Sequence, residues 1–228
     1  MDVSSILGGV VSNAIWWILG LIAFAVLLTL RRSTAWWRSL PIAKRLREQG
    51  LTRFVFSRHD YPDRLDSYLA RAQHSIKIVS ISFRLTNNEC ALTELFRRKL
   101  ALNPSFKIVL SLLDPNSNAC KLAAHALDID AVTLSREIGE MLHDLKALYD
   151  SLPPQDKGRL HILTHDCLPM GSAILLDATP TSGTIQVETK LYRAPRVESF
   201  SFEVRGPSPF YARNFTAWNR IISESKVA

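Results

Sequence analysis

Apolar residues divide the chain into a long N-terminal apolar stretch and a region where short apolar runs alternate with amphipathic ones. The 28 residues between Asp2 and Arg31 carry no charge. Within them the run from Ile6 to Leu30 can cross a hydrocarbon layer of roughly 30 Å at about 1.5 Å per residue. A cleaved signal peptide would have a basic start and a shorter apolar core. Residues 1–31 are therefore predicted to form a transmembrane helix.

Residues 32–50 follow as a basic juxtamembrane linker, in which Arg, Lys and one Glu are the charged residues. Positive charge remains on the cytoplasmic side of a membrane, and the tryptophan pair Trp36–Trp37 suits the headgroup boundary. This pattern predicts that the N-terminus lies outside and that residues 51–228 are cytoplasmic. Six of the 28 basic and two of the 21 acidic residues lie in the first 50 positions. More than half of the net charge of +7 therefore belongs to the membrane flank, and it supports an anionic partner only weakly.

The region from residue 51 onward alternates strand-like and helix-like patterns. Short runs rich in β-branched residues predict strands, and apolar residues at helical spacing predict helices. Strands are predicted at 52–56, 76–82, 106–113, 159–165, 172–177, 184–192 and 199–204, and helices at 60–73, at 89–102, within 118–151 and at 209–223. Repeated β-α units followed by close strands predict an α/β sandwich with a mixed sheet.

Three cysteines, Cys90, Cys120 and Cys167, are widely spaced and form no CxxC pair. This usage predicts reduced thiols rather than disulfides or a zinc site. No metal and no cofactor are expected.

The segment from Met170 to Asp177 has the spacing of a known active-site signature. The phospholipase D superfamily carries His-x-Lys-x4-Asp, in which the His attacks phosphorus, the Lys holds a phosphate oxygen and the Asp orients a His. In this chain Met170 stands at the place of the His, Ser172 at the place of the Lys, and Asp177 at the place of the Asp. A thioether is no proton-transfer base, and no His in the chain is followed two positions later by Lys.

Residues 52–224 as a whole resemble the catalytically degenerate phospholipase-D-like domains of bacterial regulators and defence proteins. The strand LSLLDP, the long helical region, the HILTHDCLP segment and the degenerate motif carry this resemblance. It implies a domain that binds a phosphodiester without cutting it, so no catalytic residue and no enzymatic activity are expected. Asp177, before Thr-Pro-Thr-Ser-Gly, is also what an ordinary surface turn would contain.

Anion-binding side chains are expected where strands end, because ligands of α/β sheets gather at the carboxyl ends of strands. Arg84 and His165 follow two predicted strands, with an ion pair or a loop hydrogen bond as their ordinary alternatives. Asn116 is expected to cap a helix. The complete set of predicted ligand-binding residues is Arg84, His165, Asp177, Lys190, Tyr192, Arg193, Arg196 and Arg58.

The segment KLYRAPR, residues 190–196, places three cations around Tyr192. Such a segment combines phosphate contacts with a ring on which a base can stack. A solvated edge strand has the same composition. The basic residue Arg58, near the first strand, has the same two interpretations.

The predicted membrane helix carries small and polar residues, including Gly9, Asn13 and Gly20. Small residues let helices approach closely, and an Asn can form a hydrogen bond across the interface, so self-association is predicted. This layout resembles the membrane effectors of bacterial nucleotide-signalling anti-phage systems, among them the channel effector of the Hailong system. The resemblance implies a homo-oligomeric ion channel in the bacterial inner membrane, a nucleotide or single-stranded DNA oligomer as ligand, and a nucleotidyltransferase-like partner encoded alongside.

Two other functions fit the same sequence. One is a membrane-tethered nuclease or phospholipase that uses His165 with Asp166 or Asp177. The other is a membrane scaffold that holds a cytosolic protein and carries no ligand. Turnover of a phosphodiester distinguishes the first, and a stoichiometric protein partner distinguishes the second.

Overall fold

The computed structural model describes residues 41–56, 60–61, 63–82, 89–193 and 199–228. The chain divides into two compact units, residues 1–48 and residues 49–228. The predicted transmembrane helix, with Gly9, Asn13 and Gly20, lies outside the described residues. Within the described ranges no helix is both long and apolar enough to cross a membrane.

The first unit contributes one described helix, α3 (Pro41–Glu48). The second unit contains strands and helices in alternation. Its strands are β1 (Leu51–Val55), β2 (Ser75–Ser80), β3 (Lys107–Leu113), β4 (Leu160–His165), β5 (Gly171–Leu176), β6 (Thr184–Thr189), β7 (Ser201–Arg205) and β8 (Lys226–Val227). Its helices are α4 (Leu65–Ala70), α5 (Glu89–Leu102), α6 (Asn118–Ala126), α7 (Ala131–Ser151), α8 (Pro154–Lys157) and α9 (Pro209–Glu224).

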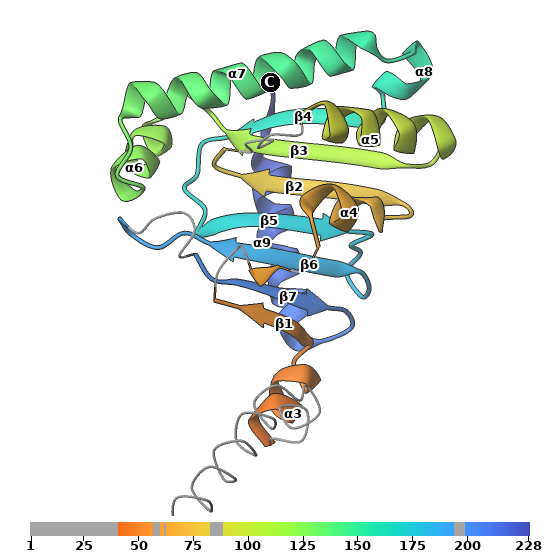
Figure 1. The fold of residues 1–228 in the computed structure, drawn as a ribbon, viewed down its shortest axis with the longest axis vertical. Helices are drawn as coiled ribbons and strands as arrows, with labels where there is room; N and C mark the ends of the chain where they lie inside the picture. Colours follow the sequence, from red (N-terminus) through yellow and green to blue (C-terminus); the bar gives the residue numbers. More distant parts are fainter. Residues whose placement is uncertain (1–40, 57–59, 62, 83–88, 194–198) are drawn as a thin grey trace, which may run out of the picture. The chain divides into compact units, whose positions relative to one another are not determined.

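The strands form one mixed sheet with the order β1-β7-β6-β5-β2-β3-β4-β8 (Figure 1). Strands β2, β3 and β4 are parallel, whereas β5 runs antiparallel to β2, and β6, β7 and β1 continue antiparallel. The prediction of an α/β fold with a mixed sheet is therefore confirmed. Because β5 runs antiparallel to β2, the loop before β5 lies where β2 ends, and the loop after β5 lies where β2 begins.

The sheet carries a hydrophobic core on each face. One core joins β2, β3 and β4 to α4, α5, α6 and α7, and Phe96, Phe106 and Ile138 are fully buried in it. The other lies between the sheet and α9, which crosses behind the strands in Figure 1. Tyr211 and Trp218 of α9 pack there, as expected for an amphipathic helix with one apolar stripe.

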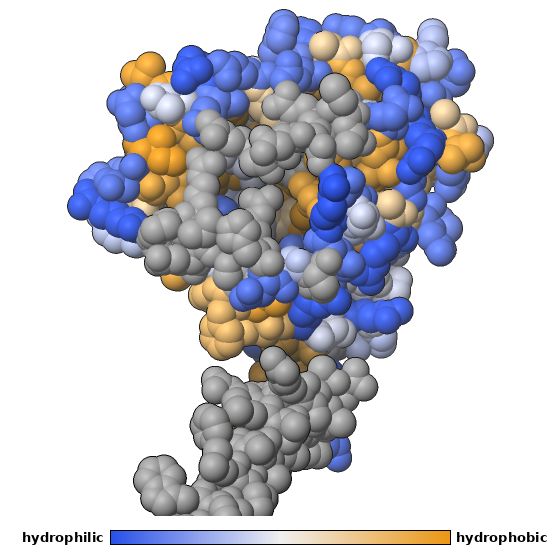
Figure 2. Space-filling view, in the orientation of Figure 1, coloured by the Kyte–Doolittle hydropathy of each residue, from blue (hydrophilic) through white to orange (hydrophobic). Residues whose placement is uncertain are grey.

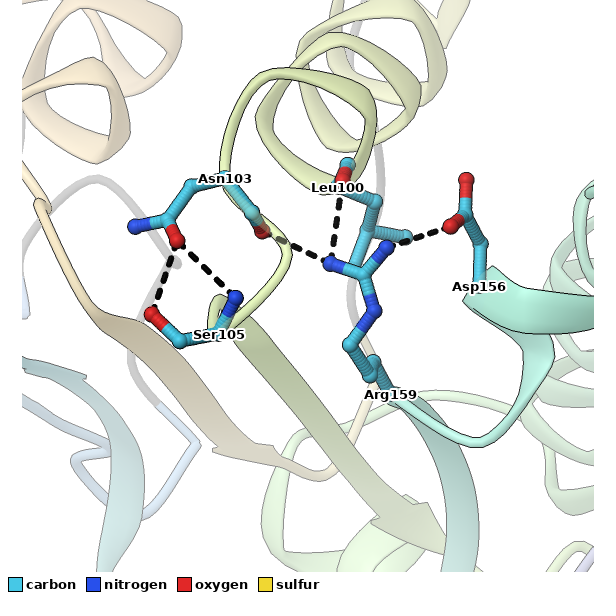
Figure 3. A network of polar contacts seen from close by, with 5 residues as sticks. All are labelled: Leu100, Asn103, Ser105, Asp156 and Arg159. Atoms are coloured by element: carbon cyan, nitrogen blue, oxygen red, sulfur yellow. Dashed lines mark hydrogen bonds and ion pairs between the residues drawn. The ribbon is translucent and has the colours of Figure 1, made fainter.

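A polar network fastens the start of β4 to the turn between α5 and β3 (Figure 3). The guanidinium of Arg159 donates to the carbonyl oxygens of Leu100 at 2.9 Å and Asn103 at 2.7 Å, and it contacts the Asp156 carboxylate. Asp156 is only 6% exposed. Asn103 in turn accepts hydrogen bonds from the backbone and hydroxyl of Ser105. The buried charge of Asp156 is thus paired, as burial requires.

Two predicted elements differ from the structure. The helix predicted at 60–73 begins only at Leu65 and ends at Ala70, and its N-cap is Arg64, which makes no side-chain cap hydrogen bond. The strand predicted at 184–192 ends at Thr189, because Lys190 leaves the ladder between β6 and β7. Asn116, expected as a cap, donates its backbone amide to Asp114, and Ser117 caps α6 instead.

Candidate functional site

One edge of the sheet gathers most of the described candidate residues. The parallel strands β2, β3 and β4 end there, β5 begins there and β6 ends there, so we call it the carboxyl edge. Figure 1 shows it on the side where α6 lies. His165 ends β4, Met170 precedes β5, and Lys190 follows β6. The arrangement agrees with the expectation that ligand-binding groups meet where parallel strands end.

The motif positions at this edge carry a thioether, on Met170, and a hydroxyl, on Ser172. Met170 is 83% exposed. The hydroxyl of Ser172 lies 2.8 Å from that of Ser80, which donates to the carbonyl of Ser82 at 3.0 Å. Because Ser80 uses its proton there, Ser172 donates to Ser80. In the described residues the Ser172 hydroxyl therefore has a hydroxyl partner and no general base.

Gly171 lies between these two positions and brings β5 close to β6. A Cβ atom built on Gly171 would lie 1.9 Å from the carbonyl oxygen of Glu188, which is well inside contact distance. Any side chain at this position would push the two strands apart. The close approach of β5 and β6 therefore requires glycine at this position.

Lys190 is mostly buried beside an acid. Its ammonium contacts the Glu188 carboxylate, and the two side chains are 16% and 13% exposed. The backbone amide of Lys190 donates to the carbonyl of Met170 at 3.0 Å. Because Glu188 neutralises it, Lys190 offers an incoming anion less attraction than a free lysine would.

Tyr192 and Arg193 form an exposed surface together with His125 of α6, which we call the Tyr192 platform. The Tyr192 side chain is 65% exposed, and its hydroxyl lies 3.2 Å from Nε2 of His125. The Arg193 guanidinium lies 5.4 Å from the centre of the Tyr192 ring. The Arg193 amide donates to the carbonyl of Ala126 at 2.8 Å, at the end of α6. These contacts fix the loop after β6 against α6, so the exposed ring is preorganised for stacking.

Sequence reasoning did not find His125. It lies in the last turn of α6, 67 positions from its partner, and nothing in its neighbours distinguishes it from an ordinary helix-surface residue. Only the folded arrangement brings it to Tyr192.

His165 lies at the carboxyl edge but points into the core beneath α9. Its Nδ1 lies 3.0 Å from the hydroxyl of Ser111, which lies 2.8 Å from that of Ser225. Ser225 donates to the carbonyl of Ile221 at 2.7 Å. Burial lowers the pKa of His165 to about 4 against a small opposing effect of the Asp166 charge, and the residue is only 4% exposed.

The faces of the sheet separate His165 from the motif. Val79 packs in the core beneath α9 and is the register partner of Ser111, so Ser111 and its neighbour His165 lie on that face. Ser80, one residue after Val79, and its partner Ser172 face the other side. A direct proton transfer between His165 and Ser172 would have to pass through the sheet.

Asp177 lies at the opposite edge from the other candidates. Its carboxylate accepts the backbone amides of Gln73 at 2.8 Å, His74 at 2.6 Å and Ser75 at 2.8 Å. Its own backbone has a φ of 49°, in the left-handed region. The expectation that Asp177 and Lys190 border one site is not met, because β5 runs antiparallel to β2 and ends where β2 begins.

The remaining predicted ligand residues, Arg84, Arg196 and Arg58, lie outside the described residues. No cluster of His, Cys, Asp and Glu that could hold a metal occurs in the part of the chain that the structure describes. Cys120 and Cys167 are free thiols, and burial raises the pKa of both.

A cavity of about 730 Å³ lies between α7 and the edge formed by β4 and β8. Asn116 and Asp114 line one end, and Leu142, Ile162 and Val227 contribute apolar surface. Lys146 and Lys157 line it together with Asp114 and Asp150, so its charges balance. Its lysines and aspartates therefore give it no excess of positive charge that would favour an anion.

Comparisons with known proteins give structural likenesses only. No protein-family model matches the chain, and no curated protein sequence matches it. Among solved structures, the chain is similar to TrmBL2, an archaeal chromatin protein whose structure shows a novel mode of DNA binding. The two share 11% sequence identity with a TM-score of 0.44, and the match covers 100% of this chain and 72% of that one. It is similar to the phospholipase D family member Nuc from Salmonella typhimurium, with 13% identity, a TM-score of 0.37 and coverage of 72% and 87%.

A third similar structure is the phosphatidylserine synthase of Haemophilus influenzae, with 11% identity and a TM-score of 0.46. The match covers 77% of this chain and 39% of that one. All three TM-scores lie below 0.5, so none of these likenesses carries the functional interpretation. That interpretation depends on the side chains of this chain.

Proposed function

We propose that this chain is a membrane-anchored, oligomeric anti-phage effector of the bacterial inner membrane. Its C-terminal phospholipase-D-like domain binds a nucleotide or a single-stranded oligonucleotide without hydrolysing it, and this binding gates a transmembrane pore. The observation that carries the proposal is the carboxyl edge. It has an exposed thioether and a hydroxyl-bonded serine at the motif positions, and it has an exposed tyrosine with a cation beside them.

Binding without hydrolysis follows from the groups present. Hydrolysis of a phosphodiester through a covalent intermediate needs a nucleophile with an adjacent base. Met170 supplies neither, Ser172 is bonded to a hydroxyl, and the buried imidazole of His165 faces the other side of the sheet. An aromatic ring with a neighbouring guanidinium, by contrast, is what sequence-tolerant binding of single strands uses.

Gating follows from linkage between ligand and assembly. A ligand that binds one state of an oligomer better than another shifts the population by that difference in affinity. The direction of the shift, opening or closing, is measured as conductance of a planar bilayer containing the chain, with and without oligonucleotide. If the oligonucleotide bound but the conductance did not change, gating would be refuted and only binding would remain.

The binding test uses the purified full chain and a fluorescein-labelled single-stranded DNA oligomer followed by anisotropy. Stacking of a base on an aromatic side chain contributes about 1–3 kcal/mol, so Tyr192→Ala is expected to weaken binding by about 5- to 150-fold. Tyr192→Phe keeps the ring and loses only the bond to His125, so it should retain most of the affinity. Arg193→Gln should lower the salt slope of binding by about 1.

The matched control is Arg97→Gln on α5, an arginine paired with Glu94 whose guanidinium also reaches Ser151 at the end of α7. It removes the same charge at the edge where the parallel strands begin, and it should leave affinity and salt slope unchanged. Equal affinities of wild type and Tyr192→Ala would show that the Tyr192 platform is not the binding surface. If the purified chain bound no cyclic or linear oligonucleotide at micromolar concentration, the proposed function would be refuted.

The enzymatic alternative has its own test. Wild type is expected to leave a generic phosphodiester intact. If it turned the substrate over and His165→Asn abolished the turnover, a membrane-tethered phosphodiesterase would replace the binding domain proposed above.

A further inference from the structure

The second unit exposes a row of stacked phenylalanine rings at the β1 end of its sheet. Phe54 stacks on Phe200 with ring centres 5.5 Å apart and meets Phe56 edge to face at 5.1 Å. Phe202, the register partner of Phe54, stacks on Phe210 at 5.5 Å. We call these five residues the phenylalanine row.

The outer members of the row are open to solvent. Phe54 is 46% exposed and Phe56 is 78% exposed. Figure 2 shows apolar side chains gathered over the β1 end of this unit. Large exposed apolar patches on soluble domains are uncommon and mark surfaces that bind a partner or a membrane. β1 is moreover the last strand of the sheet on this side, so its outer edge has no neighbouring strand among the described elements.

The chain that precedes β1 favours a membrane as the partner. Leu51, where β1 begins, follows the predicted transmembrane segment 1–31 by only 19 residues, and eight of these form α3. Eight helical residues span about 12 Å, and the other eleven span at most about 40 Å when fully extended. In the membrane-anchored protein, β1 is thus tethered near the bilayer surface.

Helix α3 has, taken alone, the composition of an interfacial helix. Ile42 and Leu46, four positions apart on one face, are 72% and 45% exposed. Lys44, Arg45 and Arg47 lie between and beside them, and none of the three forms an ion pair with another described residue. Exposed apolar residues with unpaired cations bind anionic headgroups and insert into the acyl boundary.

The second unit adds a cation to its own apolar surface. Arg213 follows Phe210 by one turn of α9, is exposed, and forms no ion pair within the part of the chain that the structure describes. The phenylalanine row therefore combines apolar rings with positive charge, which is the chemistry of an anionic lipid surface rather than of a neutral protein core.

From these observations we propose that the phenylalanine row is a membrane-docking surface, and that Phe54 and Phe56 insert into the interface of an anionic lipid bilayer. This inference rests on the proposed membrane anchoring, but it is independent of the ligand. Docking would hold the β1 end of the domain at the bilayer and would leave the Tyr192 platform to take the oligonucleotide.

The test uses the full chain in nanodiscs of phosphatidylglycerol and phosphatidylcholine. Phe56→Cys is labelled with the environment-sensitive fluorophore NBD, and the signal of the identically treated wild type is subtracted because of the native cysteines. Lipids with a nitroxide on the acyl chain are then added to the disc. Because Phe56 is 78% exposed, this substitution should not disturb folding.

Insertion predicts that nitroxide lipids quench the label at position 56 by at least about twofold. The matched control is Glu140→Cys on the exposed face of α7, where no quenching is expected. Absence of quenching at position 56 overturns the inference. Shielding from aqueous iodide without lipid quenching overturns it as well, because a second protein copy would then cover the rings.

Oligonucleotide anisotropy on the same discs separates the two proposals. Retained binding with an unquenched label refutes docking and leaves the ligand proposal standing. A chain that does not enter the discs at all refutes both the anchoring and the docking.

Discussion

Stability of the second unit, residues 49–228, should depend on pH through one buried imidazole. His165 is 4% exposed, its Nδ1 has only the Ser111 hydroxyl as partner, and its Nε2 has no partner in the described structure. Burial lowers its folded pKa to about 4. An unfolded histidine has a pKa of about 6.5. The unfolded chain therefore binds a proton between these values that the folded chain does not bind.

The sign follows from linkage. Stability rises with pH wherever the unfolded state binds more protons, so acid destabilises this domain as pH falls from about 6.5 to about 4. The full difference of about 2.5 pKa units corresponds to roughly 3 kcal/mol. Between pH 7 and pH 5 the loss amounts to about 1.8 kcal/mol.

The variant that tests this is His165→Asn, whose amide can still bond to Ser111 but does not titrate. The assay is urea unfolding of the detergent-solubilised full chain at pH 7, 6 and 5, followed by tryptophan fluorescence, to which the buried Trp218 contributes. We expect wild type to lose about 1.8 kcal/mol more than the variant over this range. His161→Asn, which removes an exposed imidazole from the same strand, should behave as wild type.

An equal pH dependence of wild type and His165→Asn would refute the reasoning. It would mean that the imidazole is solvated in the folded protein, and a solvated imidazole at the carboxyl edge would reopen its use as a base.

Three further predictions concern other parts of the chain. Asp177→Ala removes three amide contacts and places alanine at a φ of 49°, so it should lower the free energy of unfolding by about 3 kcal/mol, while Asp177→Asn, which tolerates this backbone, should lower it less. Arg159→Gln leaves Asp156 buried without its cation. This variant should lower the free energy of unfolding by about 3 kcal/mol, which is also measured by urea unfolding. Asn13→Leu removes the polar group of the predicted membrane helix and should reduce cross-linked oligomers in native membranes.

Much of the fold was predictable because its strands are buried. Runs such as FKIVLSLL and IKIVSIS are apolar on both faces, and the structure places β3 and β2 within them to one or two residues. The two-residue β8 has no such run, and it forms only because Ser225 ends α9 and the chain then reaches β4. A strand this short gives no periodicity to detect.

The candidate site was predictable only in part. His165 was expected at the end of a strand, and it ends β4. Tyr192 was instead predicted as the last residue of a strand at 184–192, whereas β6 ends at Thr189 and Tyr192 lies in the segment that follows. Its partner His125 could not be predicted, because the contact spans 67 residues. The neutralisation of Lys190 does have a signal in the sequence, because Glu188 lies two positions earlier and residues two apart on an extended segment share a face.

Asp177 shows why spacing alone does not place a residue at a given edge of the sheet. The sequence pattern of a strand does not reveal in which direction the strand runs. If β5 were parallel to β2, Asp177 would lie at the carboxyl edge, where His165 and Lys190 lie. Because β5 is antiparallel, its end meets the start of β2, where three free amides need an acceptor. The need for that acceptor is a requirement of folding, and it persists whether or not the other end of the strand carries a nucleophile. The aspartate at the motif spacing is thus accounted for in this chain by the backbone amides at the start of β2, so its presence alone does not indicate catalysis.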